Sequence, residues 1–248
     1  MAECSLIQGA SRGIGHALVR TLLAKAEVGT VYATCRDPEN AGALCALSDD
    51  PRLVVLPLDV TRESTIEAAA AAVRAGNGRL DRIVNVAGIL HDESGVAPEK
   101  RLDAISGDAL QKVFAVNAFG PLLVMKHFHQ LLRHDGRAVL ANVSARVGSI
   151  TDNRLGGWYG YRGSKAALNM FTRTAVIELA RRAPNAIVVA IHPGTVDTEM
   201  SRPFQRGIPA EKLFDTDRAA AQILNVLASL EPEQSGSFLA WDGSAIPW

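Results

Sequence analysis

Short runs of β-branched and aliphatic residues alternate along the chain with longer segments in which apolar residues recur every three or four positions. The short runs predict buried strands, and the longer segments predict amphipathic helices. The predicted strands cover residues 5–8, 30–34, 52–56, 82–86, 137–143, 186–191 and 237–240. The predicted helices cover residues 13–25, 61–74 (with Thr61 as its cap), 108–132, 159–181 and 216–230.

This alternation predicts an α/β protein, a single-domain doubly wound Rossmann fold whose parallel seven-stranded sheet carries helices on both faces. No Pro/Gly/Ser-rich linker or repeat divides the 248 residues, so we expect one domain over residues 1–248. Ligands of such sheets bind beyond the carboxyl ends of the strands. The chemistry-bearing residues should therefore follow strands.

Composition narrows the possible partners. The chain has 26 Lys and Arg and 26 Asp and Glu, and this balance speaks against a nucleic-acid-binding protein. The sequence lacks a signal-peptide pattern and an apolar run of membrane-spanning length, so we expect no membrane association. Cys4, Cys35 and Cys45 are odd in number and have no C-x-x-C spacing, which predicts reduced thiols and a cytoplasmic location.

A glycine-rich turn, Gly9-x-x-x-Gly13-x-Gly15, follows the first predicted strand. Glycines permit a tight turn and close approach of the backbone to a phosphate, and the next helix offers unpaired N–H groups at its start. An ordinary strand–helix turn would also accommodate these glycines. Their place directly after the first strand favours a dinucleotide cofactor.

The end of the second strand helps to distinguish between NAD and NADP as the cofactor. The ribose is recognised roughly 20 residues beyond the glycine turn, where an acidic residue would favour NAD. Here the strand ends at Thr34-Cys35-Arg36. Arg36, together with Arg12 in the glycine turn, is suited to a 2′-phosphate, so NADP(H) is favoured over NAD(H). The alternative is that Arg36 is a solvated loop charge.

Tyr161 and Lys165 lie four residues apart, on one face of a predicted helix. A nearby ammonium stabilises a phenolate and lowers the tyrosine pKa, which makes the phenol a usable acid–base group. Ser144 follows the fifth strand, where its hydroxyl could donate to a substrate carbonyl. Asn117 lies in the middle of a predicted helix, as either a structural amide or a member of a proton relay.

Together and in order, these motifs resemble the short-chain dehydrogenase/reductase family over almost the whole chain. Within that family, residues 33–38 and 241–248 resemble the C-factor-like and small carbonyl reductase branch. The matching positions are Gly9, Gly13 and Gly15, Asp59 in Leu58-Asp59-Val60-Thr61, Asn85-Val86-Ala87-Gly88, Asn117, Ser144, Tyr161 with Lys165, and Pro193-Gly194-x-Val196-x-Thr198.

The resemblance implies an NADP(H)-dependent oxidoreductase (EC 1.1.1.-) that interconverts a carbonyl and an alcohol. It implies Tyr161 as general acid/base, Lys165 lowering its pKa and holding the nicotinamide ribose, and Ser144 orienting the carbonyl. Asn117 would complete the relay. The implied cofactor-binding residues are Gly9, Ser11, Arg12, Gly13, Ile14, Gly15, Arg36, Asp59, Val60, Asn85, Ala87, Gly88, Tyr161, Lys165, Pro193, Gly194, Val196 and Thr198.

Two positions depart from the family pattern. The usual double Asn is Asn85-Val86, and Ser144 and Tyr161 are 17 positions apart, farther than is common. The added residues, 151–158, should border a substrate pocket. We expect its specificity to lie in residues 90–97, 145–158 and 196–215, the last of which would form a lid. Trp158 is expected to be either a wall of that pocket or an anchor of its loop.

The expected partner is a small-molecule carbonyl or alcohol. Family likeness also implies a homodimer or homotetramer built on the helices at residues 108–132 and 159–181. No metal site is expected, because His127 and His129 face different ways and His192 reads as structural. The alternative function is a C-factor-like signalling or interaction protein on a cofactor-binding reductase fold.

Overall fold

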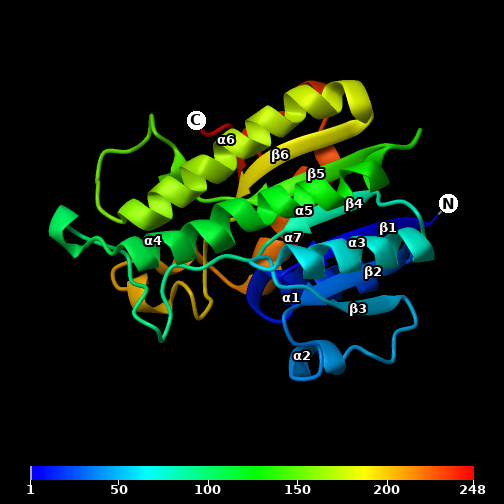
Figure 1. Cartoon of the computed structure of the whole chain (residues 1–248), viewed down its shortest axis with the longest axis horizontal. Coiled ribbons are helices and arrows are strands. Elements are labelled where there is room, and N and C mark those ends of the chain that lie inside the picture. The colour runs from blue at the N-terminus through cyan, green and yellow to red at the C-terminus, as the bar shows by residue number, and fades with distance from the viewer. Residues whose placement is uncertain (1) are drawn as a thin grey trace.

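The computed structural model describes residues 2–248 and is built around one parallel sheet (Figure 1). Its seven strands lie in the order β3-β2-β1-β4-β5-β6-β9, so the predicted fold class is confirmed. The strands are β1 (Glu3–Gln8), β2 (Val28–Cys35), β3 (Leu53–Pro57), β4 (Arg82–Asn85), β5 (Ala138–Val143), β6 (Ala186–His192) and β9 (Phe238–Ala240).

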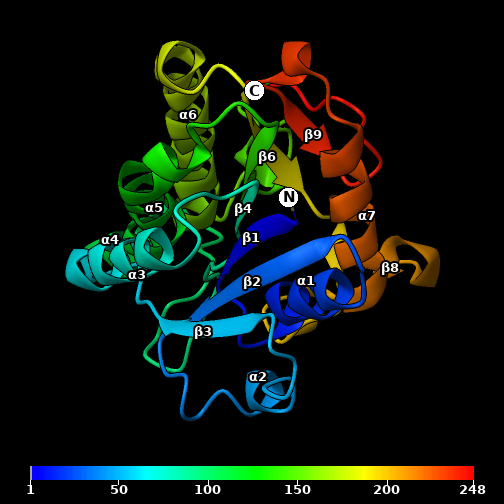
Figure 2. The same ribbon diagram turned by 90° about the vertical axis from the view of Figure 1, so that its right-hand side faces the viewer.

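Helices cover both faces of the sheet (Figure 2). On one face, α1 (Gly13–Leu23) packs against α7 (Thr216–Ser229). On the other lie α3 (Glu63–Gly76), α5 (Gly120–Phe128) and α6 (Tyr159–Arg182). Shorter elements, which the sequence pattern did not predict, are α2 (Gly42–Cys45) and a two-stranded sheet of β7 (Thr195–Val196) and β8 (Leu213–Phe214).

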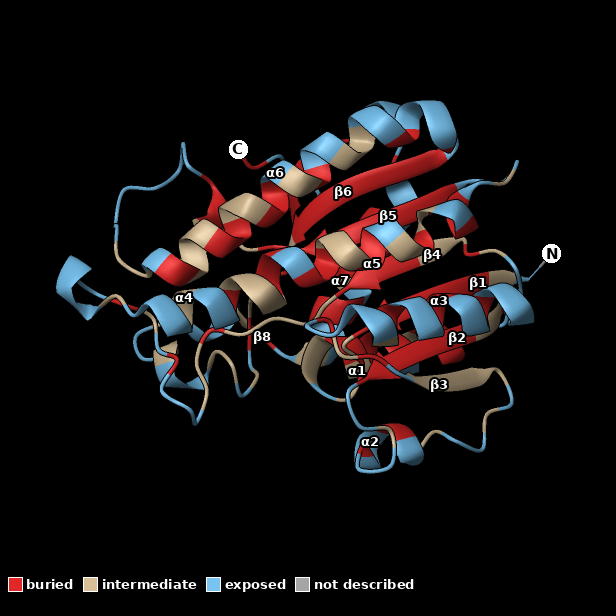
Figure 3. Cartoon of the chain, in the orientation of Figure 1, coloured by how far each residue is buried: buried red, intermediate tan, exposed pale blue. Residues whose placement is uncertain are grey.

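The central strands are buried on both faces, as parallel sheets require (Figure 3). Every residue of β5 is buried, and so is every residue of β6 except the last. One apolar core fills the space under α1 and α7, and a second fills the space under α3, α5 and α6. The two cores pack against opposite faces of the sheet and so set where the carboxyl ends of its strands lie.

The helix predicted over residues 108–132 is interrupted. It divides into α4 (Gly107–Phe114), a wide π-helical turn (Ala115–Phe119), α5 and a terminal 3₁₀ turn (His129–Leu132). Pro121 explains the wide turn, because it has no N–H to donate to the carbonyl of Asn117, four residues earlier, and its ring crowds that carbonyl. The prediction of one regular helix was therefore wrong at the position where Asn117 lies.

The prediction that Thr61 caps α3 was also wrong. The helix begins at Glu63, and the residue at its cap position is Arg62, without a side-chain cap bond. Thr61 Oγ1 instead donates to Asp59 Oδ1 over 2.7 Å. Thr61 thus fastens the loop after β3 rather than the start of the helix.

Candidate active site

A cavity of about 710 Å³ opens beyond the carboxyl ends of the central strands. That volume is typical of small-molecule and cofactor sites. The cavity brings together most of the residues predicted for the site, from segments far apart in sequence. These are Gly9, Arg12, Gly13, Ile14, Ala87, Gly88, Ser144, Tyr161, Lys165, Pro193, Gly194, Val196 and Thr198.

The glycine turn lets strand, helix and neighbouring loop approach closely. Gly9 has φ +85°, and a Cβ there would lie 2.7 Å from the backbone nitrogen of Ala87. A Cβ on Gly15 would lie 2.1 Å from the carbonyl oxygen of Gly9. Because neither position has room for a side chain, the first turn of α1 comes directly against the cavity. This backbone cradle at a helix start fits the phosphates of a dinucleotide cofactor.

Tyr161 and Lys165 lie on the first turns of α6. Lys165 is buried, its Nζ donates to Val143 O over 2.9 Å, and Nζ lies 5.9 Å from the centroid of the Tyr161 ring. Burial lowers the pKa of Lys165 to about 8 and raises the pKa of Tyr161 to about 12. The lowering of the Tyr161 pKa by Lys165 is therefore not seen in this conformation, because desolvation of the phenol dominates and the ammonium is directed to Val143.

Ser144 directly follows β5 and is held by a residue that the sequence analysis missed. Its Oγ donates to Asn169 Oδ1 over 2.7 Å, and both side chains are buried. Asn169 lies one turn beyond Lys165, so the four-residue spacing of Tyr161 and Lys165 simply continues. That spacing was the available signal for Asn169.

Asn117 does not line the cavity, but its side chain bonds to segments that surround it. Its Nδ2 donates to Ile89 O (2.8 Å) and to Ser164 Oγ (3.1 Å), and its Oδ1 accepts from Ile89 N (2.7 Å). The side chain therefore joins the loop after β4 to α6. Pro121 has no N–H, so it cannot donate to the backbone carbonyl of Asn117 four residues earlier.

Six predicted cofactor residues lie outside the cavity lining: Ser11, Gly15, Arg36, Asp59, Val60 and Asn85. The buried Asn85 amide donates to Asn142 Oδ1 over 2.7 Å, so its side chain joins β4 to β5. Arg36 is exposed just beyond β2, and Arg12 forms an exposed ion pair with Glu199. The two arginines predicted to meet a 2′-phosphate are thus accessible from the solvent.

Trp158 is both a wall and an anchor. It lines the cavity, and its ring packs edge-on against Phe204, with centroids 5.1 Å apart. Its backbone has φ +54°, the one left-handed non-glycine residue among residues 2–248, and its N–H donates to Glu99 O. The buried Glu99 also accepts from Gly160 N through its carboxylate, over 3.0 Å. Glu99, which the sequence analysis missed, therefore fixes the start of the helix that carries Tyr161.

The segment predicted as a lid runs from β7 to β8, and several of its residues line the cavity. Pairing of Thr195 with Leu213 brings its two ends together. Two contacts hold this segment: the ion pair of Glu199 with Arg12, and the contact of His91, whose Nε2 lies 3.1 Å from Met200 O. The segment thus contacts both the glycine turn and the loop after β4.

His192 ends β6 and lines the cavity, although its sequence position suggested a structural role. Burial, and then the nearby Arg146, lower its pKa to about 4, so the ring is neutral near pH 7. Its Nδ1 is buried and has no hydrogen-bond partner among the described residues. Within residues 2–248 no group of three or more His, Cys, Asp or Glu side chains is arranged to hold a metal ion.

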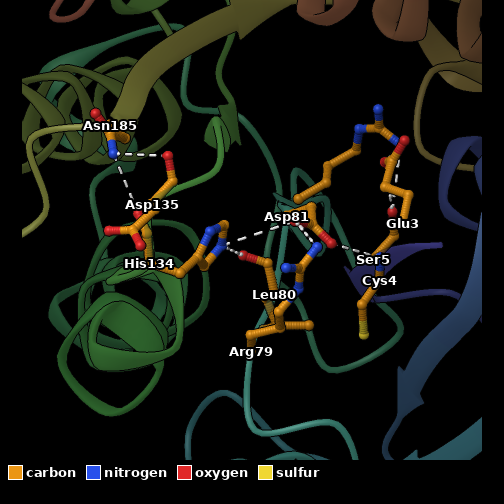
Figure 4. A network of polar contacts seen from close by, with 10 residues as sticks. Glu3, Cys4, Ser5, Arg79, Leu80, Asp81, His134, Asp135 and Asn185 are labelled. Atoms are coloured by element: carbon orange, nitrogen blue, oxygen red, sulfur yellow. Dashed lines mark hydrogen bonds and ion pairs between the residues drawn. The ribbon is translucent and has the colours of Figure 1, made fainter. Parts of the chain in front are cut away.

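A second polar cluster lies at the amino-terminal edge of the sheet (Figure 4). Asp81 accepts from Cys4 N and from Arg79 Nη2, each over 2.8 Å. His134 Nε2 lies 2.9 Å from Leu80 O. Burial, and then Asp81, raise the pKa of the Cys4 thiol to about 12. These bonds tie chain segments to one another.

The model of the short chain dehydrogenase family matches residues 3–208. This chain belongs to that family. Among its relatives, the 1-hydroxy-2-glutathionyl-2-methyl-3-butene dehydrogenase of a Rhodococcus species is 31% identical over 98% of each chain. The C-signal protein of Myxococcus xanthus is 35% identical over 72% of this chain and 99% of its own.

Solved structures of this family extend the likeness to three dimensions. The NADPH-bound carbonyl reductase from chicken fatty liver superposes with a TM-score of 0.88 at 33% identity, covering 100% of this chain and 94% of that one. The family resemblance found in the sequence is therefore confirmed, and this short-chain dehydrogenase is an oxidoreductase. None of the helices in residues 2–248 is long and apolar enough to cross a bilayer.

Proposed function

We propose that the protein is an NADP(H)-dependent carbonyl reductase or alcohol dehydrogenase with Tyr161 as its general acid/base. The observation that carries this proposal is the meeting of Tyr161, Ser144 and Lys165 in one cavity with the glycine turn. A nicotinamide cofactor in the cleft would supply or accept the hydride. The NADPH-bound chicken carbonyl reductase supports the same cofactor here.

The chain's own residues account for the proton. With its pKa raised to about 12, the Tyr161 phenol stays protonated at neutral pH, as a donor to a carbonyl oxygen must be. The Ser144 hydroxyl, held by Asn169, is placed to donate to the same oxygen. Lys165, largely protonated at pH 7, supplies the positive charge that would favour a phenolate as the proton leaves.

The test is NADPH oxidation with a panel of quinones, diketones and aldehydes. Tyr161→Phe should lower turnover by about 10²–10⁴-fold with the NADPH dissociation constant nearly unchanged, because only the proton donor is lost. Tyr159→Phe, an exposed neighbour on the same helix, is the matched control and should be fully active. Full activity in Tyr161→Phe would refute the mechanism.

The preference for NADP(H) rests on Arg36, which is exposed just beyond β2, and on the exposed Arg12, which lines the cavity. Arg36→Asp should weaken NADPH binding at least about tenfold more than NADH binding, since it replaces a charge-assisted bond by repulsion of the 2′-phosphate. Titration of both cofactors measures this ratio, with Arg74→Asp on the exposed face of α3 as control. Equal losses for the two cofactors would contradict the assignment.

The outer surface of α6 and of the π-helical turn before α5 supports the proposal of a homodimer or homotetramer. Phe119 of that turn and Met170 and Ile177 of α6 are exposed, with 48%, 63% and 65% of their surface accessible. Apolar side chains exposed together on one face are typical of an interface. Light scattering at micromolar concentration distinguishes these assemblies from a monomer.

The free thiols of Cys4, Cys35 and Cys45 support a reducing, cytoplasmic location.

The likeness to C-signal favours a second candidate, a signalling protein on a cofactor-binding fold. The same variant separates the two functions. A cellular phenotype that Tyr161→Phe restores as well as the wild type would favour signalling. A phenotype that requires the phenol would favour catalysis.

A further inference from the structure

A second cavity, of about 390 Å³, adjoins the larger one. The two share Arg146, His192, Gly194 and Thr195 in their linings. The smaller cavity is completed by residues from the lid, the first turn of α7 and the end of β9: Glu211, Lys212, Phe214, Arg218 and Trp241. Ser144, Tyr161 and Lys165 line only the larger cavity, so the smaller one is not needed for their chemistry.

The wall of the smaller cavity is aromatic. Phe214 and Trp241 pack edge-on, with ring centroids 4.9 Å apart. Gly194, with φ +81°, makes this packing possible, because a Cβ there would lie 2.5 Å from the Phe214 ring and 3.2 Å from Trp241. The glycine backbone between the two cavities therefore meets an apolar wall suited to a methylene chain or a ring.

Arg218 supplies the charge. Its guanidinium carbon lies 3.9 Å from the centroid of the Phe214 ring and 6.0 Å from that of Trp241. A guanidinium stacked by its face keeps its N–H edges available to a ligand. Within residues 2–248, Arg218 has no carboxylate within 4.0 Å.

The other charges of the lining nearly cancel. Arg146 donates to Asp152 Oδ2 over 3.1 Å, which offsets its charge. Lys212 and Glu211, next to each other in the chain, bring one positive and one negative charge to the lining. Arg218 is left as the net positive charge, which suits one negative charge rather than a dianion. The unpartnered, buried Nδ1 of His192, at the junction of the cavities, is a further polar atom on this path.

We propose that the smaller cavity is a substrate subsite, in which Arg218 binds the carboxylate of a carbonyl compound whose reacting group lies at Tyr161. The inference rests on the proposed reductase function and names a substrate class for it: carbonyl compounds with a monoanionic tail. The tail would pass His192 and Gly194 and lie along Phe214 and Trp241. Arg218 then determines specificity without touching the reacting atoms.

The test uses two matched substrates, an aryl ketone with a carboxylate-terminated side chain and its methyl ester. The wild type should have a KM for the acid about tenfold below that for the ester, since only the acid forms a charge-assisted bond. Arg218→Gln, which removes the charge and leaves a shorter polar side chain, should raise the KM for the acid about tenfold and the KM for the ester less than twofold. Arg206→Gln, an exposed lid arginine that lines neither cavity, is the control.

Two results would overturn the subsite. One is a wild type without preference for the acid, and the other is an Arg218→Gln variant that loses acid and ester equally. Calorimetry with the corresponding hydroxy acid, which needs no turnover, separates this proposal from the reductase function. If neither ketone is reduced but the hydroxy acid binds about tenfold more weakly to Arg218→Gln, the subsite stands and the reaction is wrong. If the hydroxy acid does not bind, the subsite is wrong.

Discussion

The two edges of the sheet both carry hydrogen-bonded polar side chains, yet they differ in what those side chains hold. At the amino-terminal edge, Asp81 and His134 bond to backbone atoms of neighbouring segments. At the carboxyl-terminal edge, Asn117 and Asn169 hold the loop after β4 and the hydroxyl of Ser144 beside an open cavity. Polarity alone therefore does not mark a site: what distinguishes the second edge is that its hydrogen bonds hold Ser144 in the lining of a cavity.

The largest effect should come from removing Asn117, which serves both architecture and cavity. Asn117→Ala leaves the N–H and C=O of Ile89 unpaired, so we expect a loss of about 3 kcal/mol in unfolding free energy. Because the loop and α6 both shift, kcat should fall by about 10²-fold or more in the folded fraction. Urea unfolding and NADPH oxidation measure the two losses. Unchanged kcat in the folded variant would make Asn117 purely structural.

The amino-terminal edge should show stability without activity. Asp81→Ala removes the acceptor of Cys4 N and Arg79, and we expect a loss of about 2–3 kcal/mol in unfolding free energy. The kcat of the folded protein should stay within twofold of wild type. Asp135→Ala, an exposed neighbour, should change stability by less than about 0.5 kcal/mol. A fall in kcat for Asp81→Ala would break the contrast between the two edges.

The smallest effect concerns acid. The pKa of His192 is about 4 in the folded protein against an ordinary 6.5. Between those values the unfolded chain holds a proton that the folded chain does not, so stability falls as the pH falls through that window. From pH 7 to 5 this amounts to about 1–2 kcal/mol. Urea unfolding of His192→Asn should show a flatter pH dependence; an unaltered slope would show that His192 is not neutral by burial.

The sequence predicted what local pattern determines. Buried runs located all seven strands of the main sheet to within two residues of their observed ends. Tyr161 and Lys165 were identified by spacing on a single helix. Pro121 carried the signal for the interrupted helix, because its missing N–H acts four residues away.

What the sequence did not predict depends on contacts between distant segments. Arg12 meets Glu199 across 187 positions, a pairing that no local spacing encodes. Glu99 reaches Gly160 across 61 positions and fixes the start of α6. The smaller cavity likewise exists only where lid, α7 and β9 converge.

The position of Trp158 also has an optical consequence. Its indole lies between Tyr161 and the lid residue Phe204, with ring centroids 6.2 and 5.1 Å away. Trp248, by contrast, is stacked on Phe238 away from the cleft. Emission from Trp158 will therefore respond to movement of the lid or to a ligand in the cleft, with Trp248 as an internal reference. Trp158 is thus an intrinsic fluorophore in the lining of the cavity.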